Sequence, residues 1–404
     1  LYLKGDFSMV NQKYYGLGVA PSGIRALFAY GLEKAKEIGA ENVYDYSLGN
    51  PSVPAPDCVN EEIVNLAQNY DTIKLHGYSV AAGFESTREA IAKNLNDRLG
   101  TNVKASELFL TCGCAPALCS VAFALTTGPE TNFIAIAPYF PEYNTFFEGP
   151  GGKLKVVSPD TVNFQINMAE LESLIDENTQ GVIVNSPNNP SGVVYTRETI
   201  EELAAMLTKK GEEFGHPIYI IADEPYRELV YGGIEVPFIP TIYDNTIVCY
   251  SWSKSLSLPG ERLGYVYVPE QCADSFDVYN AVMGAARILG HTCPPTLIQK
   301  VVEKCVPEMP NLEAYDENRQ LLYNSLTEMG YEMAKPDGAF YMFVKAPNGD
   351  AVAFSEKAKL EQNLLVVPAN AFGCPGYFRL SYCVSNAMIR RSLPAFKAMM
   401  EAYK

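Results

Sequence analysis

Between residues 106 and 268, short apolar runs alternate with longer stretches in which apolar residues recur at helical spacing. The apolar runs end in turn-forming residues and predict strands at residues 108–111, 133–137, 182–185, 218–222, 246–250 and 265–268. Helices are predicted among them at residues 116–125 and 196–210. Because such alternation favours a mostly parallel sheet with helices on both faces, the pattern predicts an α/β fold.

The flanking parts of the chain carry a second set of predicted elements. Helical patterns occupy residues 24–38, 59–68, 86–99, 273–289, 296–305, 312–329 and 388–402, and strand-like runs lie at residues 338–344, 364–368 and 377–382. Glycine and proline are dense at residues 49–54, which excludes a helix there and favours a loop that crosses between domains.

The composition is that of an ordinary globular protein, since 48% of the 404 residues are hydrophobic and 19% are charged. A chain of this length has room for one large α/β domain with a smaller companion. The formal net charge of −16 argues against binding to nucleic acids or anionic membrane surfaces, which repel a strongly acidic protein. No apolar run is long enough to predict a transmembrane helix.

The cysteines and histidines do not predict a metal site. Ten cysteines are scattered along the chain without a C-x-x-C pair, and only three histidines are present. Most of the cysteines stand among apolar residues, which suits small buried side chains in a reducing cytoplasm. Since the first residues also lack the regions of a signal peptide, we expect a cytoplasmic protein.

A lysine lies among hydroxyl side chains directly after a predicted strand. Ser251, Ser253 and Lys254 follow the apolar run at residues 246–250, and Arg262 precedes the next run. A buried lysine at a strand end is costly unless its amine is neutral or covalently bound, which makes Lys254 a candidate for Schiff-base chemistry. The hydroxyls and the arginine have the chemistry to bind a phosphate. Taken alone, the segment could also be an exposed lysine in a serine-rich loop.

Two further strand ends carry candidate chemistry. Gly113 turns the chain from the strand at residues 108–111 into a helix, where free backbone N–H groups and the helix dipole attract an anion. Asp223 directly follows the run at residues 218–222, at the carboxyl end of a strand, where open α/β sheets bind ligands. A buried carboxylate there must be paired. The alternatives are an ordinary strand-to-helix turn at Gly113 and a capping role for Asp223.

Four segments, in this order along the chain, resemble the class I/II, fold-type I aminotransferases, which use pyridoxal phosphate. They are Asn185-Ser186-Pro187-Asn188-Asn189-Pro190-Ser191-Gly192, Asp223-Glu224-Pro225-Tyr226, the segment from Ser251 to Arg262, and Phe378-Arg379-Leu380-Ser381. The resemblance extends from about Gly49 to the C-terminus. It implies a large cofactor-binding domain (residues 57–305) around a mostly parallel sheet of the seven-stranded type, and a smaller α/β domain built from both chain ends (residues 1–56 and 306–404).

The resemblance also implies how the cofactor is held. Lys254 would bind pyridoxal phosphate as a Schiff base, and Asp223 would keep the pyridinium nitrogen protonated so that the ring acts as an electron sink. Tyr226 and Asn189 would hydrogen-bond the phenolic oxygen of the cofactor. An aromatic side chain in the matching pattern at residues 138–143 would lie on the ring.

That aromatic residue is Phe140, with Tyr139 as the neighbouring alternative and core packing as the competing role. In the family the turn after Gly113 carries a small hydroxyl residue and then Gln, whereas this chain has Cys114 and Ala115. We therefore expect backbone N–H groups of this turn to contribute more of the phosphate binding. The other phosphate ligands that the resemblance implies are Ser251, Ser253, Arg262 and, across a dimer interface, Tyr78 of the partner subunit.

The substrate contacts come from three other places in the chain. The resemblance implies that Gly49 lets its backbone approach the substrate carboxylate, that Asn189 lies beside it, and that Arg379 binds it with a planar fork of donors. From the residues alone, Gly49 could be an ordinary turn glycine and Arg379 could form a structural salt bridge.

The implied reaction moves an amino group from an L-amino acid to a 2-oxo acid in two half-reactions, with Lys254 as the base that moves a proton from Cα to C4′. The role of Tyr78 implies a homodimer with shared active sites. Three rival hypotheses are a lyase that eliminates from sulfur amino acids with the same lysine and aspartate, a non-enzymatic cofactor-binding regulator, and a nicotinamide-dependent dehydrogenase. The chain has no spare basic segment for the regulator and no G-x-G-x-x-G for the dehydrogenase.

The amino-group donor stays open. A dicarboxylic donor needs a second cation near its side chain, and Arg287 is one candidate. Its spacing differs from the aspartate-specific pattern, which favours a solvated or structural arginine instead. Tyr15 and Tyr46 could instead line an aromatic pocket. The sequence does not choose among aspartate, aromatic and alanine-like donors.

Overall fold

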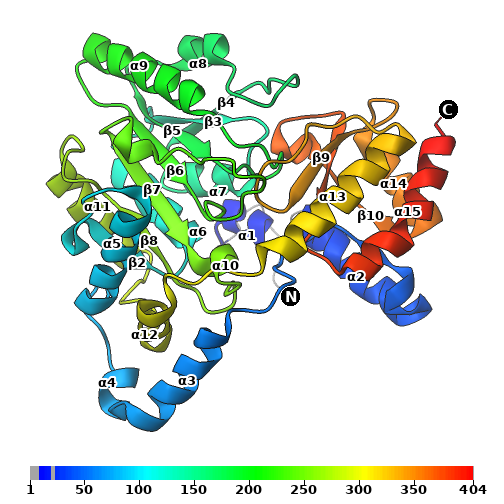
Figure 1. The fold of residues 1–404 in the computed structure, drawn as a ribbon. Coiled ribbons are helices and arrows are strands. Elements are labelled where there is room, and N and C mark those ends of the chain that lie inside the picture. Colours follow the sequence, from blue (N-terminus) through cyan, green and yellow to red (C-terminus); the bar gives the residue numbers. More distant parts are fainter. Residues whose placement is uncertain (1–8, 20–22, 404) are drawn as a thin grey trace, which may run out of the picture.

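A seven-stranded sheet forms the centre of the larger part of the molecule (Figure 1). The computed structural model describes residues 9–19 and 23–403. The strands are β2 (Leu108–Thr111), β3 (Asn132–Ile136), β4 (Lys153–Val157), β5 (Thr179–Asn185), β6 (Tyr219–Asp223), β7 (Thr246–Ser251) and β8 (Gly264–Tyr267). Their order is β2-β8-β7-β6-β5-β3-β4. Of these seven strands, β8 runs in the direction opposite to the other six. The predicted α/β fold with a mostly parallel seven-stranded sheet is confirmed.

Helices cover both faces of this sheet, because successive residues of each strand point to opposite sides. In β6, Ile220 belongs to the core on one side and Ile221 to the core on the other. The first core includes residues of α3 (Asp57–Asn69), α5 (Glu85–Leu99), α8 (Met168–Leu174), α9 (Arg197–Phe214) and α12 (Thr296–Cys305). The second includes residues of α6 (Cys114–Leu125), α7 (Glu142–Glu148) and α11 (Ser275–Ile288). The inner strands therefore bury two apolar faces, which explains their nearly continuous apolar sequences.

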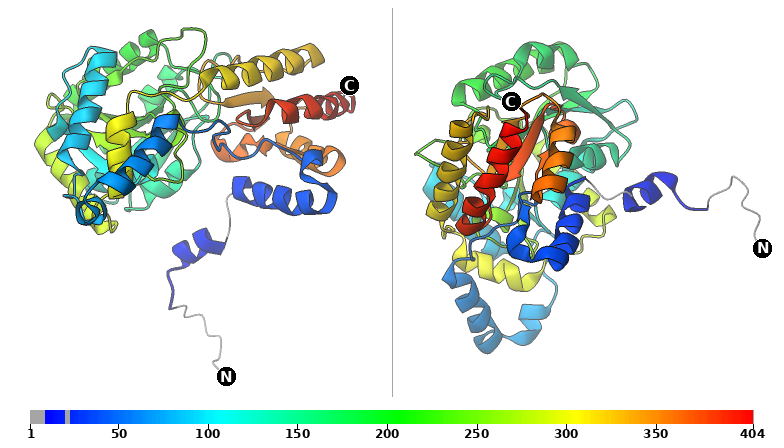
Figure 2. Two further views of the ribbon diagram at one scale, coloured as in Figure 1. Left: turned by 60° about the horizontal axis from the view of Figure 1, so that its bottom comes forward. Right: turned by 90° about the vertical axis from the view of Figure 1, so that its right-hand side faces the viewer.

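Segments from both ends of the chain meet in the smaller part of the molecule (Figure 2). Here β1 (Tyr44–Asp45) pairs in parallel with β10 (Leu364–Leu365). A three-stranded antiparallel sheet has the order β11 (Val367–Pro368), β12 (Tyr377–Ser381) and β9 (Tyr341–Lys345). The helices around it are α2 (Gly23–Ile38), α13 (Leu312–Met329), α14 (Ala351–Gln362) and α15 (Asn386–Glu401). The predicted domain limits near residues 56 and 306 stay a prediction.

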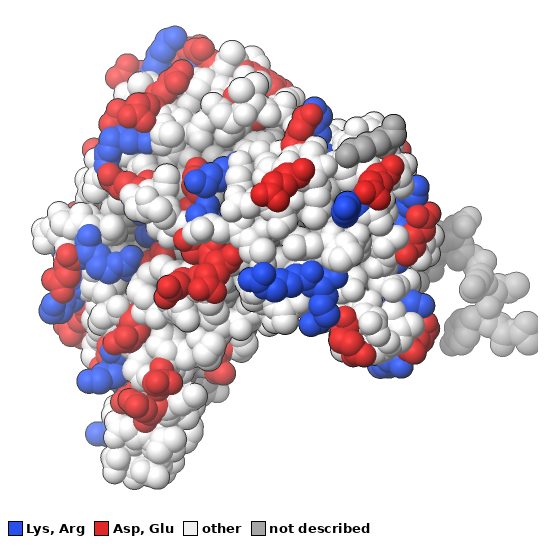
Figure 3. Space-filling model, turned by 45° about the vertical axis from the view of Figure 1, so that its right-hand side comes forward, with Lys and Arg blue, Asp and Glu red and all other residues white. Residues whose placement is uncertain are grey.

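The remaining helices are short. They are α1 (Gln12–Val19), α4 (Thr72–His76), α10 (Trp252–Ser255) and the 3-10 helices η1 (Ala40–Asn42), η2 (Ala105–Glu107), η3 (Ile239–Thr241) and η4 (Ala369–Phe372). Within residues 9–19 and 23–403, no helix combines the length and apolar character needed to cross a membrane. On the face shown in Figure 3, acidic and basic side chains lie interspersed, so positive charge is not concentrated there.

The packing of the sheet can be tested at Gly264, where β8 passes close to the backbone of Tyr250 and of Gly113. A Cβ atom at this position would collide with the carbonyl oxygen of Tyr250 and would lie 2.8 Å from the carbonyl carbon of Gly113. Since backbone atoms yield only if β7 or the Gly113 turn moves, Gly264→Ala should destabilise the protein by about 1–3 kcal/mol. The measurement is the urea midpoint of unfolding.

The matched control is Gly284→Ala in the middle of α11, where a Cβ atom would meet nothing within 4 Å. This control should leave the protein unchanged or stabilise it by up to about 1 kcal/mol through helix propensity. Equal midpoints for the two variants would contradict the tight packing of β8.

Candidate active site

A cavity of about 500 Å³ lies where the carboxyl ends of the central strands face residues of the smaller part of the molecule. The sequence-predicted residues that line it are Gly49, Cys114, Ala115, Phe140, Asn189, Asp223, Tyr226, Lys254 and Arg379. These residues come from loops and strands that are far apart in the sequence, so only the fold brings them together. Parallel strands place their carboxyl ends at one edge of the sheet, where ligands bind.

Asp223 is a buried carboxylate held by neutral donors. It ends β6 with 5% of its surface exposed, and it accepts hydrogen bonds from the Cys114 thiol at 3.0 Å and from the Tyr143 hydroxyl. Nδ2 of Asn185, on the adjacent strand, lies 3.3 Å from Oδ2. Burial raises the pKa of Asp223 to about 6, although the bonds from Cys114 and Tyr143 oppose the rise. Such a carboxylate is suited to a ligand group that brings a cationic N–H.

Lys254 presents an amine that loses its proton easily. It lies in α10, and its Nζ donates a hydrogen bond of 2.6 Å to the carbonyl oxygen of Gly49. The same Nζ lies 5.3 Å from the centre of the Phe340 ring. Burial lowers the pKa of Lys254 to about 8, and the charges of Arg379 and Arg262 add to this effect. A lysine with a lowered pKa is a stronger nucleophile near neutral pH.

Arg379 is a buried guanidinium whose donors are only partly used. Nη1 donates to Oδ1 of Asn189 at 3.1 Å, and Nη2 donates to the carbonyl oxygen of Ser47. Its Nε is buried and has no hydrogen-bond partner within the described chain. The guanidinium lies 4.7 Å from the ring centre of Tyr341 and 5.2 Å from that of Phe372. Burial lowers its pKa, so a bound carboxylate would offset the cost of placing this charge inside the protein.

Aromatic and glycine residues shape the walls between these charges. The hydroxyls of Tyr226 and Tyr341 share a hydrogen bond of 2.8 Å. A Cβ atom on Gly49 would collide with the Tyr341 hydroxyl, so this position requires glycine for space. Phe140 lines the cavity, whereas its neighbour Tyr139 does not. The structure therefore favours Phe140 over Tyr139 as the aromatic wall.

The predicted phosphate ligands gather at the start of α6. Gly113 has φ of 101°, and a Cβ atom on it would lie 2.5 Å from Nη2 of Arg262, so the guanidinium packs directly against the turn. No side chain caps the N-terminus of α6, which leaves its first N–H groups for an anion. The hydroxyls of Ser251 and Ser253 lie 3.2 Å apart. The turn thus brings backbone donors, a cation and nearby hydroxyls together.

Some predicted residues lie elsewhere. Tyr78 is 86% exposed and does not line the cavity of its own chain. Arg287 lines a separate surface groove with His291. Tyr46 was expected as a possible pocket wall, and this is wrong, because it is fully buried in the smaller core and its hydroxyl bonds Ser392 at 2.7 Å.

Sequence reasoning missed three side chains of the site, namely Tyr143, Asn185 and Tyr341. A signal existed for two of them. Tyr143 closes the aromatic pattern that contains Phe140, and Asn185 ends the strand beside β6, in register with Asp223. Tyr341 lies on β9 of the smaller part of the molecule, and no local pattern indicated that it faces the cavity.

The site fits pyridoxal phosphate in each of its parts. The buried Asp223 carboxylate lacks a cationic partner among the described residues and suits a protonated ring nitrogen, while Lys254 suits the aldehyde. The Gly113 turn with Arg262 suits the phosphate, and the free Nε of Arg379 suits a substrate carboxylate. Fold and site together define a pyridoxal-phosphate-dependent enzyme of fold-type I.

Comparisons with known proteins give the family. The model of the family "Aminotransferase class I and II" matches residues 40–396. An aspartate aminotransferase of Thermotoga maritima is 31% identical over 361 residues, which are 87% of this chain and 90% of that protein. Aromatic-amino-acid aminotransferase 2 of Thermococcus litoralis is 28% identical over 407 residues, with 96% of this chain and 97% of that protein covered.

The structural comparison agrees. A crystal structure of an aminotransferase from Eubacterium rectale superposes with a TM-score of 0.97 at 53% sequence identity, covering 98% of this chain and 100% of that chain. The chain therefore belongs to the class I and II aminotransferases. It is a pyridoxal-phosphate-dependent enzyme that transfers amino groups, which confirms the resemblance seen in the sequence.

The raised pKa of Asp223 predicts how stability depends on pH. In the folded protein without cofactor, the carboxyl keeps its proton up to about pH 6, whereas in the unfolded chain it loses the proton near its ordinary value of 3.8. The free energy of unfolding should therefore fall as the pH rises from about 4 to about 6. Asp223→Asn should remove this dependence and stabilise the cofactor-free protein at about pH 8 by about 1–3 kcal/mol.

The measurement is the urea midpoint of both proteins, without cofactor, at about pH 4 and about pH 8. The two midpoints should be close at the lower pH and should separate at the higher one. A variant that is less stable than the parent at the higher pH would contradict the burial of an uncompensated charge.

Proposed function

We propose that the cavity is the active site and that it transfers the amino group of an L-amino acid to a 2-oxo acid. The observation that carries this proposal is that Asp223, Lys254 and Arg379 face one cavity and that burial shifts the pKa of each. When bound, the cofactor supplies an electron sink for the negative charge that develops at the substrate Cα.

Each residue then has a separate task. Asp223 holds the proton on the ring nitrogen, since a carboxylate stabilises a nearby cation. Tyr226 and Asn189 orient the phenolic oxygen, and Phe140 excludes water from one face of the ring. Lys254 would hold the cofactor at rest and would serve as the base that takes a proton from the substrate Cα, because an amine whose pKa is lowered to about 8 is partly free of its proton near neutral pH.

The two anionic groups of the complex have their own ligands. We assign the phosphate to the Gly113 turn, including the backbone of Cys114 and Ala115, together with Ser251, Ser253 and Arg262. We assign the substrate α-carboxylate to Arg379, with Gly49 and Asn189 beside it. Relatives named for aspartate and for aromatic amino acids support an amino acid donor and a 2-oxo acid acceptor for this chain as well.

The proposed assembly is a homodimer in the cytoplasm. Its support is that Tyr78, Val80 and Ile288 are exposed apolar side chains, and that Ala81 and Arg287, their neighbours in the sequence, line one groove. Tyr78 of the partner subunit would complete the phosphate site. All ten cysteines are free thiols, which is typical of a reducing compartment. We also propose that residues 57–305 form the cofactor-binding domain and that both chain ends form the smaller one.

The role of Lys254 is tested by Lys254→Ala with the exposed Lys209→Ala on α9 as control. Lys254→Ala should lose the visible absorption band of the bound cofactor and lower the rate of amino transfer by at least about 10²–10⁴-fold, because the proton at Cα loses its base. The measurement is an absorption spectrum with a panel of amino acids, followed by 2-oxoglutarate. The band should bleach with the true donor and return with the oxo acid, and Lys209→Ala should behave like the parent.

Two outcomes would contradict this function. A band that persists while pyruvate and ammonia accumulate would identify an eliminating lyase. A protein that shows no band after pyridoxal phosphate is added would remove the basis of the proposed site.

The dimer is tested by Val80→Asp, which places a charge on the proposed interface. Val80 is 65% exposed, whereas the control Val162→Asp changes a residue that is 89% exposed on a different surface loop. Light scattering should give the mass of two chains for the parent and the control, and a smaller mass for Val80→Asp, because an unpaired buried charge opposes association. A parent protein with the mass of one chain would contradict the dimer.

A further inference from the structure

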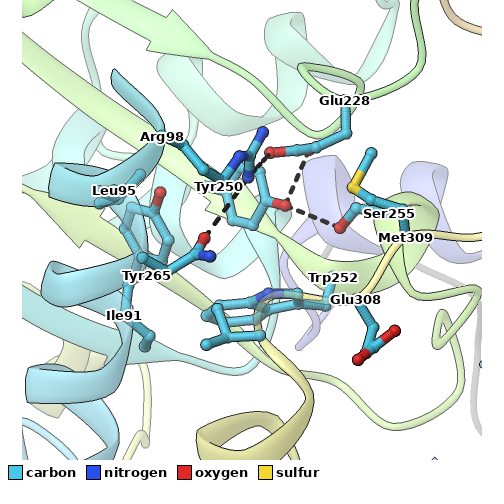
Figure 4. Close-up of a pocket in the computed structure, with 12 residues that line it drawn as sticks. Ile91, Leu95, Arg98, Glu228, Tyr250, Trp252, Ser255, Tyr265, Glu308 and Met309 are labelled. Carbon is cyan, nitrogen blue, oxygen red and sulfur yellow. Dashed lines mark hydrogen bonds and ion pairs between the residues drawn. The ribbon is translucent and has the colours of Figure 1, made fainter. Parts of the chain in front are cut away.

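Four polar side chains outside the active-site cavity are linked by hydrogen bonds, as Figure 4 shows. The last of them, Ser255, is the residue after Lys254. Nη1 of Arg98, in the last turn of α5, lies 3.1 Å from Oε1 of Glu228. The other carboxylate oxygen of Glu228 accepts a bond of 2.9 Å from the Tyr250 hydroxyl. The same hydroxyl lies 2.7 Å from the hydroxyl oxygen of Ser255. We refer to Arg98, Glu228, Tyr250 and Ser255 as the Arg98–Ser255 chain.

The direction of each hydrogen bond in the Arg98–Ser255 chain is fixed. A carboxylate only accepts hydrogen bonds, so Tyr250 donates its single proton to Glu228. Ser255 must then donate to Tyr250. Since Tyr250 has one proton to give, the bond between the two hydroxyls has one direction, and no alternative arrangement satisfies all groups.

The Arg98–Ser255 chain joins the segment of Asp223 to the segment of Lys254. Glu228 lies in the segment that begins at Asp223 and contains Tyr226. Ser255 is the residue after Lys254. The helix that holds Lys254, α10, has four residues, which is too short to be stable by itself. Contacts with the rest of the protein must therefore fix its position.

Burial makes these contacts strong. Glu228 and Ser255 are 5% and 2% exposed, and only Arg98 reaches solvent. The Tyr250 ring packs against two other aromatic rings, with its centre 5.0 Å from that of Tyr265 and 5.4 Å from that of Trp252. The cavity beside the Arg98–Ser255 chain measures about 10 Å³, which is about the smallest volume that can hold one water molecule. A lost hydroxyl would therefore leave its partner poorly solvated.

We propose that the Arg98–Ser255 chain positions Lys254, by anchoring α10 through Ser255 and Tyr250 to the Glu228 carboxylate on the segment of Asp223. These are positioning residues, since none of them lines the active-site cavity. The inference rests on the proposed role of Lys254. It adds that the distance between Lys254 and Asp223 is set from outside the active-site cavity by an ion pair whose carboxylate is buried.

The test compares Tyr250→Phe with Tyr243→Phe in the full-length protein with its cofactor. Both changes remove a buried tyrosine hydroxyl. The Tyr250 hydroxyl bonds Glu228 and Ser255, whereas the Tyr243 hydroxyl donates to the carbonyl oxygen of Ile218, away from α10. The first readout is hydrogen exchange of the peptide that contains residues 251–258. Tyr250→Phe should speed exchange there about tenfold, because the anchor contributes a hydrogen bond to a charged group, and Tyr243→Phe should not.

The second readout is the pH midpoint of the visible absorption band. Tyr250→Phe should shift this midpoint to higher pH, because a loosened α10 lets water stabilise the protonated lysine nitrogen. The charges that face Lys254, which are those of Arg379 and Arg262 with the Cys383 thiol nearby, are unchanged in all variants. A merely structural loss of stability would not move the midpoint.

Ser255→Ala is the second variant in case Tyr250→Phe folds poorly. It should reproduce both effects, whereas Ser255→Thr should behave like the parent because it keeps the donor. The double variant with Tyr250→Phe should add little, since both changes break the bond between Tyr250 and Ser255. Exchange and midpoint values equal to those of Tyr243→Phe would overturn the inference. If instead the band of the parent protein does not depend on Lys254, the proposed function fails and not only the positioning.

Discussion

The burial of the Asp223 carboxylate is the constraint on which the site depends. The residue ends the central strand β6, between β5 and β7, so the sheet removes it from water. Neutral donors, Cys114, Tyr143 and Asn185, hold it without cancelling its charge. The folded protein therefore carries an electrostatic cost that a cationic ring nitrogen can offset. Cofactor binding and stability are coupled through this one carboxylate.

The other charges of the site are arranged to complement it. Lys254 reaches the carbonyl oxygen of Gly49, and Arg379 reaches Asn189 and the carbonyl oxygen of Ser47, so both bridge the larger and smaller parts of the molecule. The two cations face one cavity, and the charge of Arg379 adds to burial in lowering the pKa of Lys254. Two buried cations attract an anion, and a carboxylate bound here would offset the cost of burying the arginine, as we propose for the substrate.

The central strands and the residues at their ends could be predicted because each is a local pattern, such as the apolar run that ends at Asp223. The strand β4 was not, since two lysines on this edge strand interrupt its apolar residues. The direction of the Cys114 side chain depends on where α6 begins relative to β6, which is a tertiary property. Tyr341 was missed for the same reason. The local sequence indicates which residues can bind or react with a ligand, whereas tertiary packing determines which of them lie together in the site.

The central claim is that Lys254 is the residue that binds the cofactor in this charge arrangement. The most direct measurement is borohydride reduction of the protein with pyridoxal phosphate, followed by peptide mass spectrometry. The account predicts the pyridoxyl group on the peptide that contains Lys254, and its loss from that peptide when an amino acid donor is added first. A label on another lysine, or on none, would contradict the account.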